Sequence, residues 1–170
     1  EKYDLSSLEA IAYGGAPAAP ELVRKIREVF GSMPGNGWGM TETSPAGTNL
    51  LPFGEPKPGS IGMPLPGVEL QIVSLDDPHQ VLPAGEVGEL RIRGKNVTAG
   101  YWNKPEENEA AFADGFFLTG DVGYMAEDGY FYIVDRKKDM ILSGGFNVYP
   151  QMIEQAIYEH PAVAECIVLG

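Results

Sequence analysis

The residues best suited to chemistry in this sequence are residues 37–43, which read Gly-Trp-Gly-Met-Thr-Glu-Thr. Glycines on both sides of Trp38 allow the backbone to approach a flat ligand, and the indole ring can stack on it. The hydroxyl of Thr41 can donate to a phosphate oxygen, and the carboxylate of Glu42 is a hard oxygen ligand suited to Mg²⁺. Taken alone, the segment is more simply interpreted as a glycine-rich loop with a core tryptophan and a surface glutamate.

Two further polar groups lie much later in the chain. Asp121 follows an aromatic segment and a Thr-Gly pair, and its ionised carboxylate can accept the two hydrogen bonds that a ribose diol donates. Arg136 stands in the charged run of residues 135–139 and offers a planar fork of donors to the same sugar or to a phosphate. Each residue by itself is more simply interpreted as a turn aspartate or a solvated charge.

Residues 14–17, Gly-Gly-Ala-Pro, form a further candidate site. They join a strand expected over residues 8–13 to a helix that we expect to begin at Pro20 and to stop at Gly31. In α/β proteins, ligands bind at the carboxyl ends of strands, where this turn would lie. The turn is not a phosphate loop of the G-x-x-x-x-G-K-[ST] type, which the sequence lacks.

Composition excludes several classes of function. With 44% hydrophobic and 21% charged residues among 170, the chain can bury a sizeable core and is not disordered as a whole. The formal net charge of -12 argues against general nucleic-acid binding. No run of about 18 apolar residues is present, so we expect no transmembrane segment.

Cysteine and histidine usage points to neither a disulfide framework nor a metal cluster. Cys166 is the only cysteine, and its apolar surroundings predict a buried structural thiol. His79 and His160 are far apart, and we expect both to be structural or solvated.

The elements that must position the candidate residues change in kind along the chain. After the strand and helix near the start, residues 35–66 are rich in Gly, Pro, Thr and Ser. Alternating apolar and polar residues, and an Asp-Gly hairpin turn at residues 128–129, then predict short antiparallel strands. We expect these strands over 68–72, 89–93, 123–125 and 130–134, a helix over 105–113, a strand over 140–142, a helix from Pro150 to His160, and a strand from Val163.

These patterns predict a mixed α/β fold. Residues 1–60 would form an α/β part, and residues 61–135 would form an antiparallel, barrel-like subdomain. Residues 136–138 would be a hinge, because the run is charged and the pattern changes after it. Residues 139–170 would begin a small α/β domain.

The order of the motifs resembles that of the adenylate-forming enzymes. It runs from residues 14–17 and 37–42 to residues 119–121, 135–139 and 143–150. That family includes AMP-forming acyl-CoA ligases, the adenylation domains of peptide synthetases and firefly-type luciferases. Residues 135–154 look most like bacterial medium- and long-chain fatty-acid–CoA ligases. The resemblance implies that residues 1–60 end the nucleotide-binding part of a large domain. One mild departure is Trp38, because the family usually has tyrosine there.

The resemblance implies a role for each candidate residue. The ATP- or AMP-binding residues would be Gly15, Ala16, Pro17, Asn36, Gly37, Trp38, Gly39, Met40, Thr41, Asp121 and Arg136. Trp38 would stack on adenine and Asp121 would bind the ribose. Thr41, at the phosphate, and Glu42, holding Mg²⁺ through ATP, would be the catalytic residues. Lys138 would be the hinge, and Gly144, Gly145 and Phe146 would form a loop beside the CoA channel.

The resemblance also implies the substrates, which would be a fatty acid, ATP with Mg²⁺, and CoA. The enzyme would be cytoplasmic, with peripheral contact to the inner membrane left open. The family's upstream phosphate loop and its C-terminal adenylating lysine are not matched, so we expect an internal piece that is inactive alone. Alternatives are an aryl-CoA ligase or other carboxylate-adenylating enzyme, and a non-catalytic nucleotide-binding module of the same fold.

Overall fold

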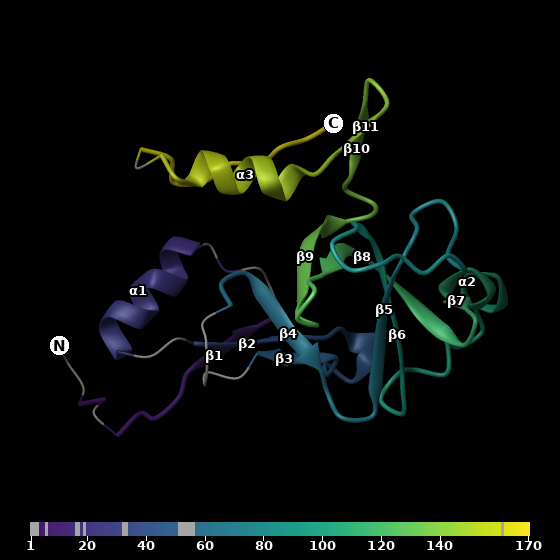
Figure 1. Cartoon of the computed structure of the whole chain (residues 1–170), viewed down its shortest axis with the longest axis horizontal. Coiled ribbons are helices and arrows are strands. Elements are labelled where there is room, and N and C mark those ends of the chain that lie inside the picture. Colours follow the sequence, from purple (N-terminus) through teal and green to yellow (C-terminus); the bar gives the residue numbers. More distant parts are fainter. Residues whose placement is uncertain are drawn as a thin grey trace.

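One large sheet runs through most of the computed structural model of the chain (Figure 1). The structure describes residues 4–5, 7–15, 18, 20–31, 34–50, 57–160 and 162–170. The sheet has the strand order β1-β2-β3-β4-β9-β8-β6-β5, and β7 pairs with β8. Its strands are β1 (Ala12–Gly14), β2 (Gly35–Trp38), β3 (Thr48–Leu50), β4 (Ser60–Pro64), β5 (Val68–Val73), β6 (Gly88–Gly94), β7 (Phe112–Ala113), β8 (Phe116–Met125) and β9 (Phe131–Arg136).

The remaining elements are short helices and a separate hairpin. The hairpin consists of β10 (Ile141–Ser143) and β11 (Phe146–Val148). The helices are α1 (Pro20–Phe30), the 3₁₀ turn η1 (Thr41–Thr43), α2 (Pro105–Ala111) and α3 (Pro150–Tyr158). No helix in the described part of the chain is both long and apolar enough to cross a membrane.

The α/β beginning follows the sequence pattern closely. The strands β1 and β2 pair in parallel and α1 connects them, whereas the other pairings in the sheet are antiparallel. Helix α1 begins at Pro20, and the N–H of Gly31 bonds to the carbonyl of Arg27 at its end. A proline at the first helical position and a glycine just past the end produce these bounds.

The core lies under the antiparallel strands. Leu70 and Ile72 on β5 oppose Ile92 and Leu90 on β6, and all four side chains are buried on one face with Phe117. The alternation works because successive side chains of a strand point to opposite faces. Strand β4 pairs with both β3 and β9, so the α/β part and the antiparallel part share one continuous sheet.

Three expectations about local structure were wrong. The helix expected over residues 105–113 ends at Ala111, because Phe112 and Ala113 pair with Phe117 and Phe116 as β7. The first strand is shorter than residues 8–13 and covers Ala12–Gly14.

The third correction concerns the last residues. No strand forms over residues 162–170, where backbone N–H groups bond to side chains of α3 instead of to a neighbouring strand. The N–H of Cys166 donates to the hydroxyl of Tyr158 (3.3 Å), and that of Val168 donates to Glu154 Oε1 (2.8 Å). For the same reason Cys166 is half-buried against α3 rather than enclosed in a core.

Candidate functional site

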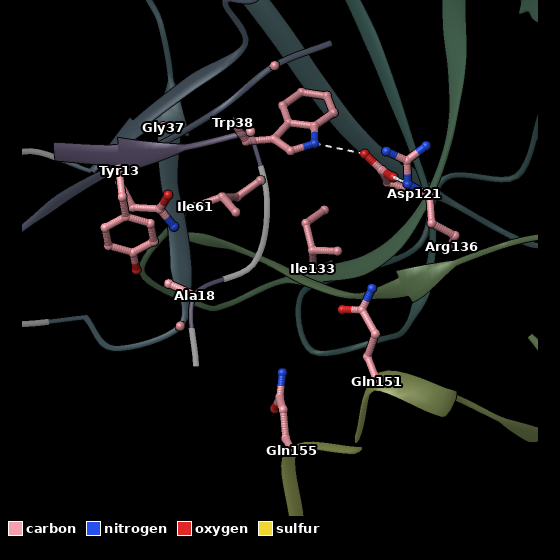
Figure 2. Close-up of a pocket in the computed structure, with 14 residues that line it drawn as sticks. Tyr13, Ala18, Gly37, Trp38, Ile61, Asp121, Ile133, Arg136, Gln151 and Gln155 are labelled. Carbon is pink, nitrogen blue, oxygen red and sulfur yellow. Dashed lines mark hydrogen bonds and ion pairs between the residues drawn. The ribbon is translucent and has the colours of Figure 1, made fainter. Parts of the chain in front are cut away.

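A cavity of about 160 Å³ opens between the sheet and α3, and Trp38 forms part of its wall (Figure 2). We call it the Trp38 cavity. Its lining residues are Tyr13, Gly15, Ala18, Asn36, Gly37, Trp38, Gly39, Gly59, Ile61, Asp121, Ile133, Arg136, Gln151 and Gln155. The predicted site residues among them are Gly15, Asn36, Gly37, Trp38, Gly39, Asp121 and Arg136. The structure therefore brings together segments that lie up to about 120 residues apart in the sequence.

Trp38, Asp121 and Arg136 are directly linked to one another. The indole Nε1 of Trp38 donates to Asp121 Oδ2 at 2.7 Å, and Arg136 Nε lies 2.7 Å from Asp121 Oδ1 (Figure 2). The Asp121 side chain is only 5% exposed. Burial raises the pKa of Asp121, while the Trp38 hydrogen bond and the Arg136 charge lower it and the Glu89 charge raises it. The arrangement presents a flat aromatic ring beside a carboxylate with further acceptor positions, which suits a base and its sugar.

Strand pairing explains why Asp121 and Arg136 meet. The two residues are register partners on β8 and β9, so their side chains are cross-strand neighbours. The hydroxyl of Thr119 fixes the strand before Asp121: it donates to the carbonyl of Leu90 (2.8 Å) and accepts from the N–H of Asp121 (3.1 Å). Thr119 is therefore a structural support for the strand that carries the carboxylate.

The segment around Trp38 is held by internal packing as well. The buried amide of Asn36 donates to the carbonyl of Ser60 at 2.9 Å and ties β2 to β4. A side chain at Gly39 would meet the backbone of Pro45 at 2.4 Å. Gly39 is thus required by the fold, whereas a Cβ at Gly37 would be only in ordinary contact with Thr48.

The two residues expected to be catalytic do not line the cavity, although they follow the lining residue Gly39 closely in the sequence. Thr41 and Glu42 lie on η1, where Thr41 is exposed. Glu42 Oε1 accepts a hydrogen bond from the hydroxyl of Tyr101 at 2.9 Å. Burial and this bond to Glu42 raise the pKa of Tyr101. Met40 packs against the core cluster instead of facing the cavity.

Within the charged run of residues 135–139, the Lys137 side chain is bonded to the sheet whereas the Lys138 side chain is not, and a turn bond from the N–H of Asp139 to the carbonyl of Arg136 (3.0 Å) spans both lysines. Lys137 is anchored to the sheet twice, through its N–H to the carbonyl of Gly120 (2.8 Å) and through Nζ to the buried Glu89 (2.7 Å). Lys138 is exposed, and no bond holds its side chain to the described part of the chain. A pivot at Lys138 is compatible with this geometry, and its role as a hinge stays a prediction.

The predicted CoA-side loop is the tip of the β10–β11 hairpin. Gly144 and Gly145 both have positive φ there (59° and 84°), which glycine adopts without strain. Phe146 is exposed, and the hairpin extends away from the large sheet (Figure 1). These residues do not line the Trp38 cavity, and Ala16 and Pro17 lie outside the described residues.

Sequence reasoning missed the residues that close the cavity. Gln151 and Gln155 reach it from α3, and Tyr13, Ala18, Gly59, Ile61 and Ile133 complete the lining. The apolar residues of α3 predict a helix but do not indicate that its glutamines face the sheet. A signal for the two glutamines was available, because residues four apart lie on one face of a helix.

Comparison with known proteins shows which family the chain belongs to. The family model described as "AMP-binding enzyme" matches residues 1–102, which is more than half of the chain. The chain belongs to the AMP-binding enzyme family.

Relatives of this AMP-binding chain include ligases with different named substrates. The long-chain-fatty-acid–CoA ligase of Bacillus subtilis is 44% identical over all 170 residues, which make up 30% of that protein. The probable 4-coumarate–CoA ligase 2 of Dictyostelium discoideum is 43% identical over the whole chain and 31% of its own length. The chain thus spans about a third of the length of the curated relatives it matches.

Solved structures confirm the predicted mixed α/β fold. MatB from Rhodopseudomonas palustris in its ATP-bound form is 38% identical and has a TM-score of 0.89, covering 95% of this chain and 32% of its own. The apo form of MatB, with the same identity and coverage, has a TM-score of 0.79. The AMP-binding chain is therefore arranged more like the ATP-bound form than the apo form of this relative.

Proposed function

We propose that this chain forms the adenosine-binding part of an ATP-dependent, AMP-forming carboxylate–CoA ligase that acts on a fatty acid. The observation that carries the proposal is the bonded group of Trp38, Asp121 and Arg136 on one wall of the cavity. Adenine would stack on the indole ring, and the ribose hydroxyls would donate to the free acceptor positions of Asp121. Membership of the AMP-binding family supports this assignment.

The proposed reaction has two steps. A carboxylate oxygen of the acid attacks the α-phosphorus of ATP, the bond to pyrophosphate breaks, and acyl-AMP forms. The thiolate of CoA then attacks the acyl carbon, and AMP leaves with the bonding electrons. The chain would contribute to both steps by aligning the bound nucleotide, ATP in the first and acyl-AMP in the second. Alignment of the reacting groups accounts for much of the rate enhancement in such transfers.

Glu42 would hold Mg²⁺ together with the phosphates. Its carboxylate fits that role, because one oxygen is fixed by Tyr101 and Mg²⁺ is commonly bound by one or two carboxylates plus substrate oxygens. The ion supplies charge neutralisation at the phosphates when bound. Thr41, one residue earlier on η1, is exposed, and its hydroxyl would donate to a phosphate oxygen.

The substrate is the part of the proposal that most needs an experiment. Relatives named for a fatty acid and for 4-coumarate are almost equally identical to the chain, so an aryl-CoA ligase is the second candidate. The test measures pyrophosphate release and thioester formation by the full-length protein, with decanoate, palmitate and 4-coumarate in parallel. We expect turnover with the fatty acids. Turnover with 4-coumarate and with neither fatty acid would indicate an aryl-CoA ligase instead. Binding of AMP with no turnover of any of the three acids would indicate a non-catalytic nucleotide-binding module.

A further inference from the structure

Helix α3 supplies a polar wall to the Trp38 cavity from beyond the charged run. Gln151 and Gln155 lie one helical turn apart and both line the cavity, opposite the wall that carries Trp38 (Figure 2). Neither amide has a hydrogen-bond partner elsewhere in the described part of the chain. A side-chain amide offers two donors and an acceptor, so both glutamines are equipped to bind a polar ligand.

The other side of α3 is apolar and does not contribute to the cavity. Met152, Ile153 and Ile157 are exposed large hydrophobic residues, and none of them lines the cavity. The helix therefore turns its amides, not its apolar side chains, toward the cavity.

A buried carboxylate holds the helix in this orientation. Asp135, the residue before Arg136 on β9, is 1% exposed. Its Oδ1 accepts from the N–H of Arg136 at 2.7 Å, and its Oδ2 accepts from the N–H of Gln151 at 3.0 Å. The second bond satisfies one of the backbone donors that the first turn of a helix leaves free. It joins the sheet directly to α3 across the exposed Lys138.

We propose that Gln151 and Gln155 are nucleotide-binding residues, and that Asp135 is the positioning residue that holds α3, and hence both amides, over the Trp38 cavity. The inference rests on the proposed function, because it takes the occupant of the cavity to be an adenine nucleotide.

The first arm of the test measures AMP affinity of the full-length protein by calorimetry. Gln151→Ala and Gln155→Ala should each weaken AMP binding by about two- to tenfold, since one net hydrogen bond contributes about 0.5–1.5 kcal/mol. Met152→Ala is the matched control, because that side chain is 58% exposed on the same helix and does not line the cavity. Unchanged affinity in both glutamine variants would overturn the binding role.

The second arm tests Asp135 with a double-mutant cycle. If Asp135 acts only by holding α3, Asp135→Ala should weaken AMP binding about as much as the double variant Gln151→Ala/Gln155→Ala, and combining all three should add little. Asp135→Asn keeps one acceptor oxygen, which can serve the N–H of Gln151 but not that of Arg136 as well, so it should restore part of the affinity. If the loss of AMP affinity in the triple variant equals the sum of the losses in Asp135→Ala and in the double glutamine variant, Asp135 does not act through the glutamines and the positioning role is overturned. Circular dichroism and the melting temperature show whether each variant folds. If Asp135→Ala does not fold, the AMP affinities of Gln151→Ala and Gln155→Ala still decide whether the glutamines bind the nucleotide.

Trp38→Ala separates this inference from the proposed function. Weak binding by Trp38→Ala together with unchanged glutamine variants would overturn the inference alone. Absence of AMP binding in the unmodified full-length protein would overturn both.

Discussion

The two sides of the charged run differ in how much of their structure is held by their own packing. Before it, the antiparallel strands enclose a core in which Leu90 and Ile92 are fully buried. After it, the hairpin and α3 expose most of their apolar side chains, with Leu142 at 73% and Phe146 at 75%. In the described chain the later region is held to the sheet by few contacts, of which the Asp135–Gln151 bond is one. The Trp38 cavity is therefore formed mainly by the first region, and α3 of the second region adds Gln151 and Gln155 to its lining.

The largest expected effect is on stability and tests this contrast directly. Leu90→Ala should lower the free energy of unfolding by about 2–5 kcal/mol, because it leaves a cavity in a fully packed core. Leu142→Ala, at an exposed position on β10, should change it by less than about 0.5 kcal/mol. Denaturant titration of the full-length protein measures both. An equally large loss for Leu142→Ala would show that the hairpin has a core of its own in the whole protein.

The next effect concerns ligand binding by the first region. Asp121→Ala in the full-length enzyme should weaken AMP binding at least tenfold, because each hydrogen bond to the charged carboxylate contributes about 1.5–3 kcal/mol. Asp128→Ala is a suitable control, since Asp128 lies at an exposed hairpin turn and does not line the cavity. Unchanged affinity in a folded Asp121→Ala variant would refute the ribose assignment.

Sequence reasoning succeeded where a local pattern determines the structure. The bounds of α1 follow from Pro20 and Gly31, and the alternation around Leu70 and Leu90 correctly predicts β5 and β6. The helix bounds and the alternation depend on residues within a few positions of one another. The types of Trp38 and Asp121 by themselves favour a core tryptophan and a turn aspartate, and only the order of the motifs along the chain indicates a nucleotide site.

The rest depends on contacts between distant segments. The bond from Trp38 to Asp121 joins residues 83 positions apart, and the sequence contains no sign that the indole N–H would be used for it. Gln151 and Gln155 become cavity residues because α3 packs beside β9, where the backbone N–H of Gln151 bonds to Asp135 from 16 positions earlier in the chain. The strand expected from Val163 does not form, because the backbone N–H groups of Cys166 and Val168 donate to side chains of α3.

The third prediction concerns the connection between the regions. Proline at position 138 would fix φ near -65° and favour an extended Lys137. Lys138→Pro in the full-length enzyme should therefore retain acyl-AMP formation and reduce CoA transfer at least tenfold, if the later region must change its pose between the two steps. Single-turnover measurement of each half-reaction provides the test. Equal losses in both, or none in either, would mean that Lys138 is not the hinge.

The smallest effect is a shift in pH dependence that probes how Trp38 controls Asp121. Ribose hydroxyls need the ionised carboxylate, so adenosine affinity should fall as the pH drops through the raised pKa of Asp121. The Trp38 N–H favours the ionised form, and Trp38→Phe removes that donor while keeping a ring that can stack. The pKa should then rise further, and the loss of affinity should begin at a higher pH than in the unmodified enzyme. Adenosine is the better probe, because the phosphate of AMP titrates with a pKa of about 6. A Trp38→Phe variant whose affinity falls uniformly at every pH would show that the ring acts by stacking alone and that its N–H does not influence the carboxylate.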